Sequence, residues 1–315
     1  MEFFIYDRLM IQLTDTPVHV LHVDGHDVFV KRDDLLHPAF SGNKARKFAY
    51  FLEQDFPSID TLVGYGSPQA NSLYSMSALA KLKGWQLQFY VDHIASHLLN
   101  NPLGNYRAAL QNGAKIIDLS QCLDRGQHDC ADYIEQCVLP GRDELLFIPE
   151  GGRCHYAEPG VRQLAREIIA WKQAEQLSQL TVFLPSGTGT TALFLQKSFT
   201  ELDDSIQVMT CSAVGGDDYL KLQWRMLASD ESMFPQILSP NKRYHFGKLY
   251  PEFFQVWQKL KQAGMEFELL YDPLGWLVLL HFLANKPMAK VLYVHQGGIL
   301  GNESMLPRYR RKYGG

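Results

Sequence analysis

Residues 30–48 read VKRDDLLHPAFSGNKARKF, and the rest of the chain can be interpreted outward from this stretch. A run of β-branched and aromatic residues leads into it, and a loop containing Pro38 then gives way to a helical pattern that begins near Asn43. Lys44 would therefore lie in the first turn of a helix, where the helix N-terminus and neighbouring cations both favour the uncharged amine. Such an amine can form a Schiff base with a carbonyl compound. The alternative is that Lys44 belongs to a solvated basic run.

The composition is that of a globular protein with an ample core. The chain has 315 residues, 46% of them hydrophobic, which suits one large domain or two smaller ones. Its net charge of −4 lacks the basic excess that is typical of nucleic-acid-binding proteins. The five cysteines include no C-x-x-C pair, which argues against a zinc site and a disulfide framework, so we expect reduced thiols.

No segment of the sequence predicts a membrane protein. The first residues, MEFFIYDRLM, carry acidic side chains where a signal peptide is basic. The longest apolar stretch, Gly275 to Ala284, is interrupted by His281 and is too short to cross a bilayer. We therefore expect a cytoplasmic protein. We also expect no metal site at His19 and His22, because these two positions point to opposite faces of a strand.

Strand-like and helix-like segments alternate along most of the chain. Two β-rich runs flank Asp24-Gly25, which predicts a hairpin. Further strands are expected at 61–65, 86–91, 115–119, 144–148, 180–184, 206–211, 267–271 and 291–294, and helices at 71–83, 104–112, from 157, and at 190–200, 250–263 and 276–284. This alternation predicts an α/β fold with two open, mainly parallel, twisted sheets, flanking helices, and a ligand cleft beyond the carboxyl ends of the strands.

The loop at 185–192, PSGTGTTA, follows a hydrophobic strand and precedes a helix. Its glycines let the backbone approach an anion, its hydroxyls can donate hydrogen bonds, and the helix N-terminus adds a favourable field, so we expect a phosphate here. A dinucleotide is a weaker alternative, because Cys211-Ser212-Ala213 replaces the acidic residue of that fingerprint. A Walker A loop is excluded because no Gly-Lys-Ser/Thr follows. An ordinary glycine-rich turn is the remaining alternative.

Two other turns end predicted strands. Residues 64–72, GYGSPQANS, place Asn71 at a helix start, which by itself indicates a turn and a helix cap. Residues 294–298, VHQGG, end a buried strand with a polar pair and two glycines, which is typical of a ligand-binding loop or of a simple turn.

Five motifs, in the same order over nearly the whole chain, carry a family resemblance: SGNKARK at 41–47, PEGG at 149–152, SGTGTT at 186–191, YHFG at 244–247 and HQGG at 295–298. Together they resemble the pyridoxal-phosphate enzymes grouped as 1-aminocyclopropane-1-carboxylate deaminase and D-cysteine desulfhydrase. The resemblance implies the tryptophan-synthase-β-like fold with pyridoxal 5′-phosphate in the cleft between two domains. The smaller α/β domain would comprise 49–156, inserted into a larger one formed by 1–48 and 157–315, and the protein would be a homodimer.

The same resemblance implies roles for individual residues. Lys44 would hold the cofactor through a Schiff base and act as a catalytic base, and Tyr271 would lie over the cofactor as the second catalytic residue. Further cofactor contacts would come from Asn71 at the phenolic oxygen, from Gln296 near the pyridine nitrogen, and from the phosphate loop of Gly187, Thr188, Gly189, Thr190 and Thr191. The substrate would face Ala70, Ser72 and Tyr244.

The sequence also departs from the family pattern. Ala70 stands where the family has a serine, Asp272-Pro273-Leu274 replaces Thr-Gly-Lys after Tyr271, and Gln296 replaces a threonine. The leading interpretation is a deaminase or desulfhydrase that converts a small amino acid to a keto acid with loss of ammonia or sulfide. The alternatives are a different β-elimination, a cofactor-binding homologue that has lost turnover, and a nucleotide-binding α/β protein.

Overall fold

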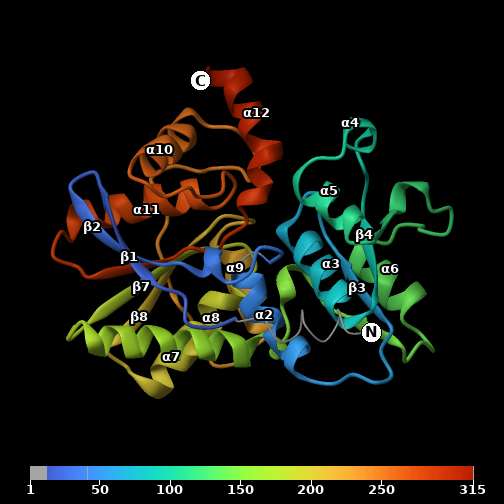
Figure 1. The fold of residues 1–315 in the computed structure, drawn as a ribbon, viewed down its shortest axis with the longest axis horizontal. Helices are drawn as coiled ribbons and strands as arrows, with labels where there is room; N and C mark the ends of the chain where they lie inside the picture. The colour runs from blue at the N-terminus through green and yellow to red at the C-terminus, as the bar shows by residue number, and fades with distance from the viewer. Residues whose placement is uncertain (1–12, 41, 315) are drawn as a thin grey trace.

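Two open β-sheets form the framework of the computed structural model, which describes residues 13–40 and 42–314 (Figure 1). The larger sheet has six strands in the order β1-β2-β10-β7-β8-β9, with bounds Val18–Val23, His26–Lys31, Val291–Val294, Leu180–Ser186, Ile206–Ser212 and Gln236–Ile237. The smaller sheet has four strands in the order β5-β4-β3-β6, with bounds Lys115–Asp118, Gln86–Val91, Thr61–Tyr65 and Leu145–Phe147. The acidic start of the chain and Ser41 of the SGNKARK motif lie outside the described residues.

All strand pairs are parallel except β1 and β2, which are antiparallel. The turn between β1 and β2 has Asp24 and Gly25 at positive φ angles of 47° and 81°, as a two-residue hairpin that matches strand twist requires. The predicted α/β class and the predicted mainly parallel sheets are therefore confirmed. The strands of the smaller sheet all come from residues 61–147, and those of the larger sheet lie on either side of them in sequence.

Helices cover both faces of both sheets. Their bounds are Gly42–Glu53 (α2), Asn71–Lys83 (α3), Ser96–Asn100 (α4), Gly104–Gln111 (α5), Cys130–Tyr133 (α6), Glu158–Ala174 (α7), Thr190–Leu202 (α8), Asp217–Arg225 (α9), Pro251–Gln262 (α10), Asp272–Asn285 (α11) and Asn302–Tyr313 (α12). Helices α7 and α8 pack on one face of the larger sheet, and α10, α11 and α12 pack on the other. No helix among the described residues is long and apolar enough to span a bilayer.

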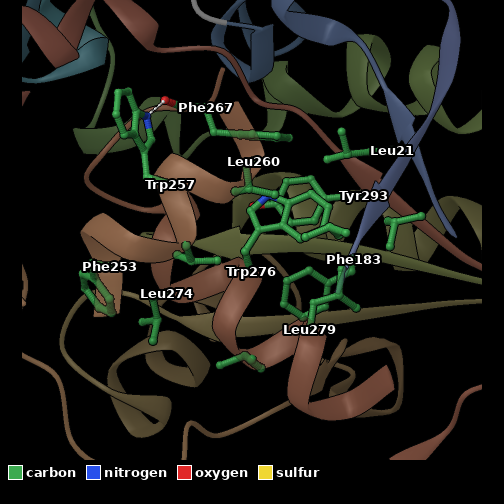
Figure 2. Packing of buried hydrophobic residues seen from close by; sticks show 14 of the residues in the cluster. Leu21, Phe183, Phe253, Trp257, Leu260, Phe267, Leu274, Trp276, Leu279 and Tyr293 are labelled. Carbon is green, nitrogen blue, oxygen red and sulfur yellow. Dashed lines mark hydrogen bonds between the residues drawn. The ribbon is translucent and has the colours of Figure 1, made fainter. Parts of the chain in front are cut away.

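The core between the larger sheet and helices α10 and α11 is rich in aromatic rings (Figure 2). The Trp276 ring stacks on Tyr293 with centroids 4.6 Å apart, and Phe267 contacts both rings edge-on. The Trp257 indole N–H donates to the Phe267 carbonyl at 2.8 Å, so the buried indole nitrogen is satisfied. This packing fixes the segment that leads from Phe267 into α11.

One predicted strand is wrong. Residues 267–271 join no sheet, and α11 begins at Asp272, four residues before the predicted start at 276. The reason is local hydrogen bonding, since the Glu268 carboxylate accepts the backbone N–H groups of Leu270, Tyr271 and Asp272. A carboxylate on the free N–H groups of a helix start, followed by Pro273 in the first turn, favours a helix rather than a sheet ladder.

Candidate active site

One cavity collects side chains from the carboxyl ends of strands in both sheets. Its lining comes from α2, from the turns after β3 and β6, from the loop after β7, from the segment after β8 with α9, from the start of α11, and from the turn after β10. The cavity therefore lies where the sequence predicts a ligand cleft. It is lined by every predicted site residue except Tyr244, namely Lys44, Ala70, Asn71, Ser72, Gly187, Thr188, Gly189, Thr190, Thr191, Tyr271 and Gln296.

Lys44 lies in the first turn of α2, as predicted, and its side chain is buried. Burial lowers the pKa of Lys44 to about 8, and the nearby Glu150 carboxylate offsets part of this shift. The helix N-terminus and the neighbouring cations were expected to lower this pKa, but desolvation is the main cause. Arg46 cannot be responsible, because both sides of its guanidinium are paired with the carboxylates of Asp33 and Glu167.

The loop after β7 carries the glycines and hydroxyls that the sequence indicated for an anion. Gly189 has a φ angle of 67° and precedes α8, and a Cβ there would lie 2.3 Å from the Trp224 indole nitrogen. Only glycine fits this position. The Thr188 and Thr190 hydroxyls are 3.0 Å apart, and the buried Thr191 Oγ1 has no hydrogen-bond partner among the described residues. The loop thus offers an unused hydroxyl beside the cavity.

The turn before α3 forms a second wall. Asn71 is the first residue of α3, and its Oδ1 accepts a hydrogen bond of 2.8 Å from Asn105 Nδ2. A Cβ at Gly298 would lie 2.5 Å from Asn71 Nδ2, so the glycine permits close packing against the amide. Ala70 occupies the cap position of α3 and supplies no side-chain hydrogen bond, whereas Ser72 is buried beside it.

Gln296 ties three elements together at the floor of the cavity. Its Nε2 donates to the Pro185 carbonyl at 2.8 Å, and its Oε1 accepts from Asn43 Nδ2 at 3.0 Å. Both ends of the amide are therefore engaged with the protein. Tyr271 lies beside the loop after β7, since a Cβ at Gly187 would be 3.3 Å from the tyrosine ring. Burial raises the pKa of Tyr271 well above its ordinary value.

Tyr244 lies apart from these residues. Its hydroxyl donates to Glu252 at 3.1 Å, its ring packs on Tyr250 and Phe253, and it lines a separate, smaller pocket. The YHFG motif instead approaches the main cavity through Phe246, whose ring centroid is 5.0 Å from that of Tyr271. Adjacency in a motif did not reveal which aromatic ring would face the site.

Three acidic residues line the cavity that sequence reasoning did not select: Glu150, Glu268 and Asp272. Glu150 belongs to the PEGG motif, so its position between a strand and two glycines was a usable signal. Asp272 Oδ1 accepts a hydrogen bond of 2.5 Å from Tyr293, while its buried Oδ2 has no partner among the described residues. Burial raises the pKa of both Glu268 and Asp272, and repulsion between the two carboxyl groups adds to the shift of Asp272.

Comparisons with known proteins show which proteins the chain resembles. No family model matches the chain. The D-cysteine desulfhydrase of Serratia proteamaculans is 24% identical over 299 residues, which cover 87% of each chain. A putative 1-aminocyclopropane-1-carboxylate deaminase of Pyrococcus horikoshii is 22% identical and covers 94% of this chain and 93% of its own.

Solved structures show the same fold. A structure described as an ACC deaminase homologue matches with a TM-score of 0.78 and 20% identity, over 99% of both chains. O-ureido-L-serine synthase matches with a TM-score of 0.68 and 14% identity, over 95% of this chain and 93% of its own. The chain is therefore similar over most of its length to proteins named D-cysteine desulfhydrase and putative 1-aminocyclopropane-1-carboxylate deaminase, and it shares the fold of a structure described as an ACC deaminase homologue.

Proposed function

We propose that the protein is an enzyme that binds pyridoxal 5′-phosphate through Lys44 and acts on a small amino acid. The reaction would be of the type named in its relatives, a desulfhydration of D-cysteine or a deamination of 1-aminocyclopropane-1-carboxylate. One observation carries this proposal: a buried lysine amine and a phosphate-type glycine loop open into the same cavity. Alone, the lysine could belong to a solvated basic run, and the glycine loop could be an ordinary turn. Their presence in one cavity favours a cofactor site.

The residues present fit the cofactor. The backbone of Gly187 to Thr191 and the unpartnered Thr191 hydroxyl can hold a phosphate at the start of α8. Lys44, with its pKa of about 8, has a substantial uncharged fraction near neutral pH and can bind an aldehyde covalently. Gln296 was expected near the pyridine nitrogen, but its amide is already engaged. The unpartnered Oδ2 of Asp272 at the cavity wall is a second candidate for that contact.

When bound, pyridoxal phosphate supplies an electron sink that stabilises negative charge at the carbon atom next to the substrate amine. The chain's own residues do the rest. The Lys44 amine, once free, can accept the proton from that carbon at Nζ. The first-turn N–H groups of α3, at Asn71 and Ser72, have no partner within the helix and can bind the substrate carboxylate. Ala70 offers no hydroxyl for proton transfer, so a different side chain must act as the second proton-transfer group.

Several broader features belong to the same proposal. The resemblance suggests a cytoplasmic homodimer with a smaller domain at 49–156, which agrees with the origin of all four strands of the smaller sheet within 61–147. The cavity would then lie between the two domains. Sedimentation of the purified protein measures the assembly state directly.

The test of the proposal is where the cofactor attaches. Borohydride reduction of the loaded protein, followed by peptide mapping, should place a pyridoxyl adduct on Lys44. Adducts on Lys31 or Lys47, or an absence of adduct and of yellow colour, would refute it. Because only the uncharged amine reacts, the rate of cofactor binding at Lys44 should increase with pH. It should increase about tenfold per pH unit up to about pH 8 and level off at higher pH.

A further inference from the structure

Glu150 is an unassigned carboxyl group in the same cavity as Lys44. Glu150 is the first residue of the short helical turn Glu150–Gly152 that follows β6, so it reaches the cavity from the smaller sheet. Lys44 reaches the same cavity from α2. The Glu150 side chain is open to the cavity. The two groups interact electrostatically, since the Glu150 carboxylate raises the pKa of Lys44 and the Lys44 ammonium lowers that of Glu150.

The other cavity carboxyl groups are assigned to other contacts. Glu268 accepts three backbone N–H groups at the start of α11. Asp272 is buried, its Oδ1 accepts from the Tyr293 hydroxyl, and its unpartnered Oδ2 is the candidate contact for the pyridine nitrogen. By contrast, the Glu150 carboxyl makes no hydrogen bond to any residue in the ranges 13–40 and 42–314. It is therefore available to a bound molecule.

The remaining ionisable groups of the cavity are poorly suited to donate a proton. Lys47 donates to the Gly151 carbonyl at 2.8 Å, and burial lowers its pKa well below the ordinary value, which disfavours the charged amine. Burial raises the pKa of both Tyr219 and Tyr271, which makes the phenols weak acids. Ala70 supplies no hydroxyl. The cavity thus has a base in Lys44 and needs a separate acid.

We propose that Glu150 is the general acid of this site and protonates the group that leaves the β-carbon of the substrate. This inference rests on the proposed function. With D-cysteine, Lys44 Nζ takes the proton from the α-carbon, and the electron pair of that bond forms the double bond to the β-carbon. The bond from the β-carbon to sulfur breaks with both electrons on sulfur, and the Glu150 proton completes hydrogen sulfide. The Lys44 ammonium then returns a proton to the Glu150 carboxylate, so no oxidant or reductant is needed.

The electrostatic surroundings suit this role. Glu150 is exposed to the cavity, but the protein atoms around the cavity partly desolvate its carboxyl group and raise its pKa above the ordinary value, and the charges of Arg153 and Lys44 offset part of the shift. The tyrosines around it, Tyr65 and Tyr219, stay neutral because their own pKa values are raised. A raised carboxyl pKa increases the protonated fraction at a given pH, and this fraction falls as pH rises through that pKa. An acid tuned toward the working pH transfers protons most efficiently.

The decisive experiment compares two leaving groups in Glu150→Gln, which keeps the shape and removes the acid. D-Cysteine turnover should fall by about 10²–10⁴ in kcat, the usual contribution of a positioned acid, with a smaller change in KM. Turnover of β-chloro-D-alanine should change by about tenfold or less, because chloride leaves without a proton. Glu150→Asp retains a carboxyl group and should recover part of the D-cysteine rate. The matched control is Glu144→Gln, which alters an exposed carboxylate paired with Arg142 just before β6 and should leave both rates unchanged.

A second readout is independent of turnover. In the cofactor-free protein, competitive acetylation across pH should give a Lys44 midpoint near 8 in the wild type and a lower one in Glu150→Gln, because a nearby negative charge is lost. The assignment would be overturned by any of three results in Glu150→Gln: an equal loss of kcat with both substrates, an unchanged kcat with D-cysteine, or an unchanged pH midpoint of Lys44 acetylation. Absence of a Lys44 adduct in the wild type would instead refute the proposed function, and the acetylation result would still report whether Glu150 and Lys44 interact.

Discussion

Replacing Glu167 by glutamine should destabilise the protein strongly, because this carboxylate completes a buried charge cluster behind the Lys44 helix. Glu167 accepts hydrogen bonds of 2.6 and 2.8 Å from Arg46 and lies 2.7 Å from the Lys31 ammonium. Asp33 pairs with the other side of the guanidinium at 2.8 Å. The four side chains therefore carry two positive and two negative charges, and the substitution leaves one buried positive charge uncompensated.

The expected loss in the free energy of unfolding is about 3–5 kcal/mol, the usual result of removing one partner from a buried ion pair. With a urea m-value of about 3 kcal/mol/M, the unfolding midpoint should fall by roughly 1–1.7 M. The control is Glu231→Gln, which breaks an exposed pair with Arg225 whose side chains are 56% and 50% accessible. That control should change stability by about 1 kcal/mol or less.

The effect should also depend on pH. Burial acts to raise the pKa of Glu167, but hydrogen bonds and charges from Arg46 and Lys31 outweigh it and hold the pKa below its ordinary value. A depressed carboxyl pKa contributes stability that is present above the unfolded pKa of about 4.3 and is lost as pH falls through the folded pKa. The difference in the free energy of unfolding between the wild type and Glu167→Gln should therefore be largest at neutral pH and decrease below about pH 4. A midpoint shift at neutral pH no larger than that of Glu231→Gln would refute the assigned role of the cluster.

Two further substitutions test the walls of the cavity. Gly189→Ala should cost about 1–2 kcal/mol of backbone strain and add a clash with Trp224, so we expect weaker retention of pyridoxal phosphate. Gly84→Ala, at a similar φ of 73° with open space around its Cβ, should share the strain but retain the cofactor, and equal retention by both variants would contradict the steric argument. Ala70→Ser places a capping side chain at the start of α3 and should stabilise the protein by about 0.5–2 kcal/mol in the same urea assay. It should also raise turnover of D-cysteine or 1-aminocyclopropane-1-carboxylate with an unchanged cofactor spectrum, and a wild-type rate that it does not improve would show that the hydroxyl is dispensable.

Much of the fold was predictable because strand and helix periods are local properties of the sequence. The strands at 61–65, 86–91 and 291–294 have the predicted bounds, and the hairpin at Asp24-Gly25 forms because that pair tolerates positive φ angles. Helix α9 falls in a stretch at 213–249 for which no helix was predicted, and α12 was also missed. Residues 267–271 have a strand-like pattern, but side-chain hydrogen bonds from Glu268 override it.

The α/β class, the position of Lys44 in a first helical turn and the glycine loop before α8 could be predicted from the sequence, since each depends on neighbouring residues. Which charges share the cavity depends on how distant elements pack. Glu150 and Lys44 are far apart in sequence, and the pKa of about 8 at Lys44 exists because packed elements exclude water from the amine. Tyr244 lies outside the cavity for the same reason, because a side chain's partners depend on the elements packed around it and not on its motif.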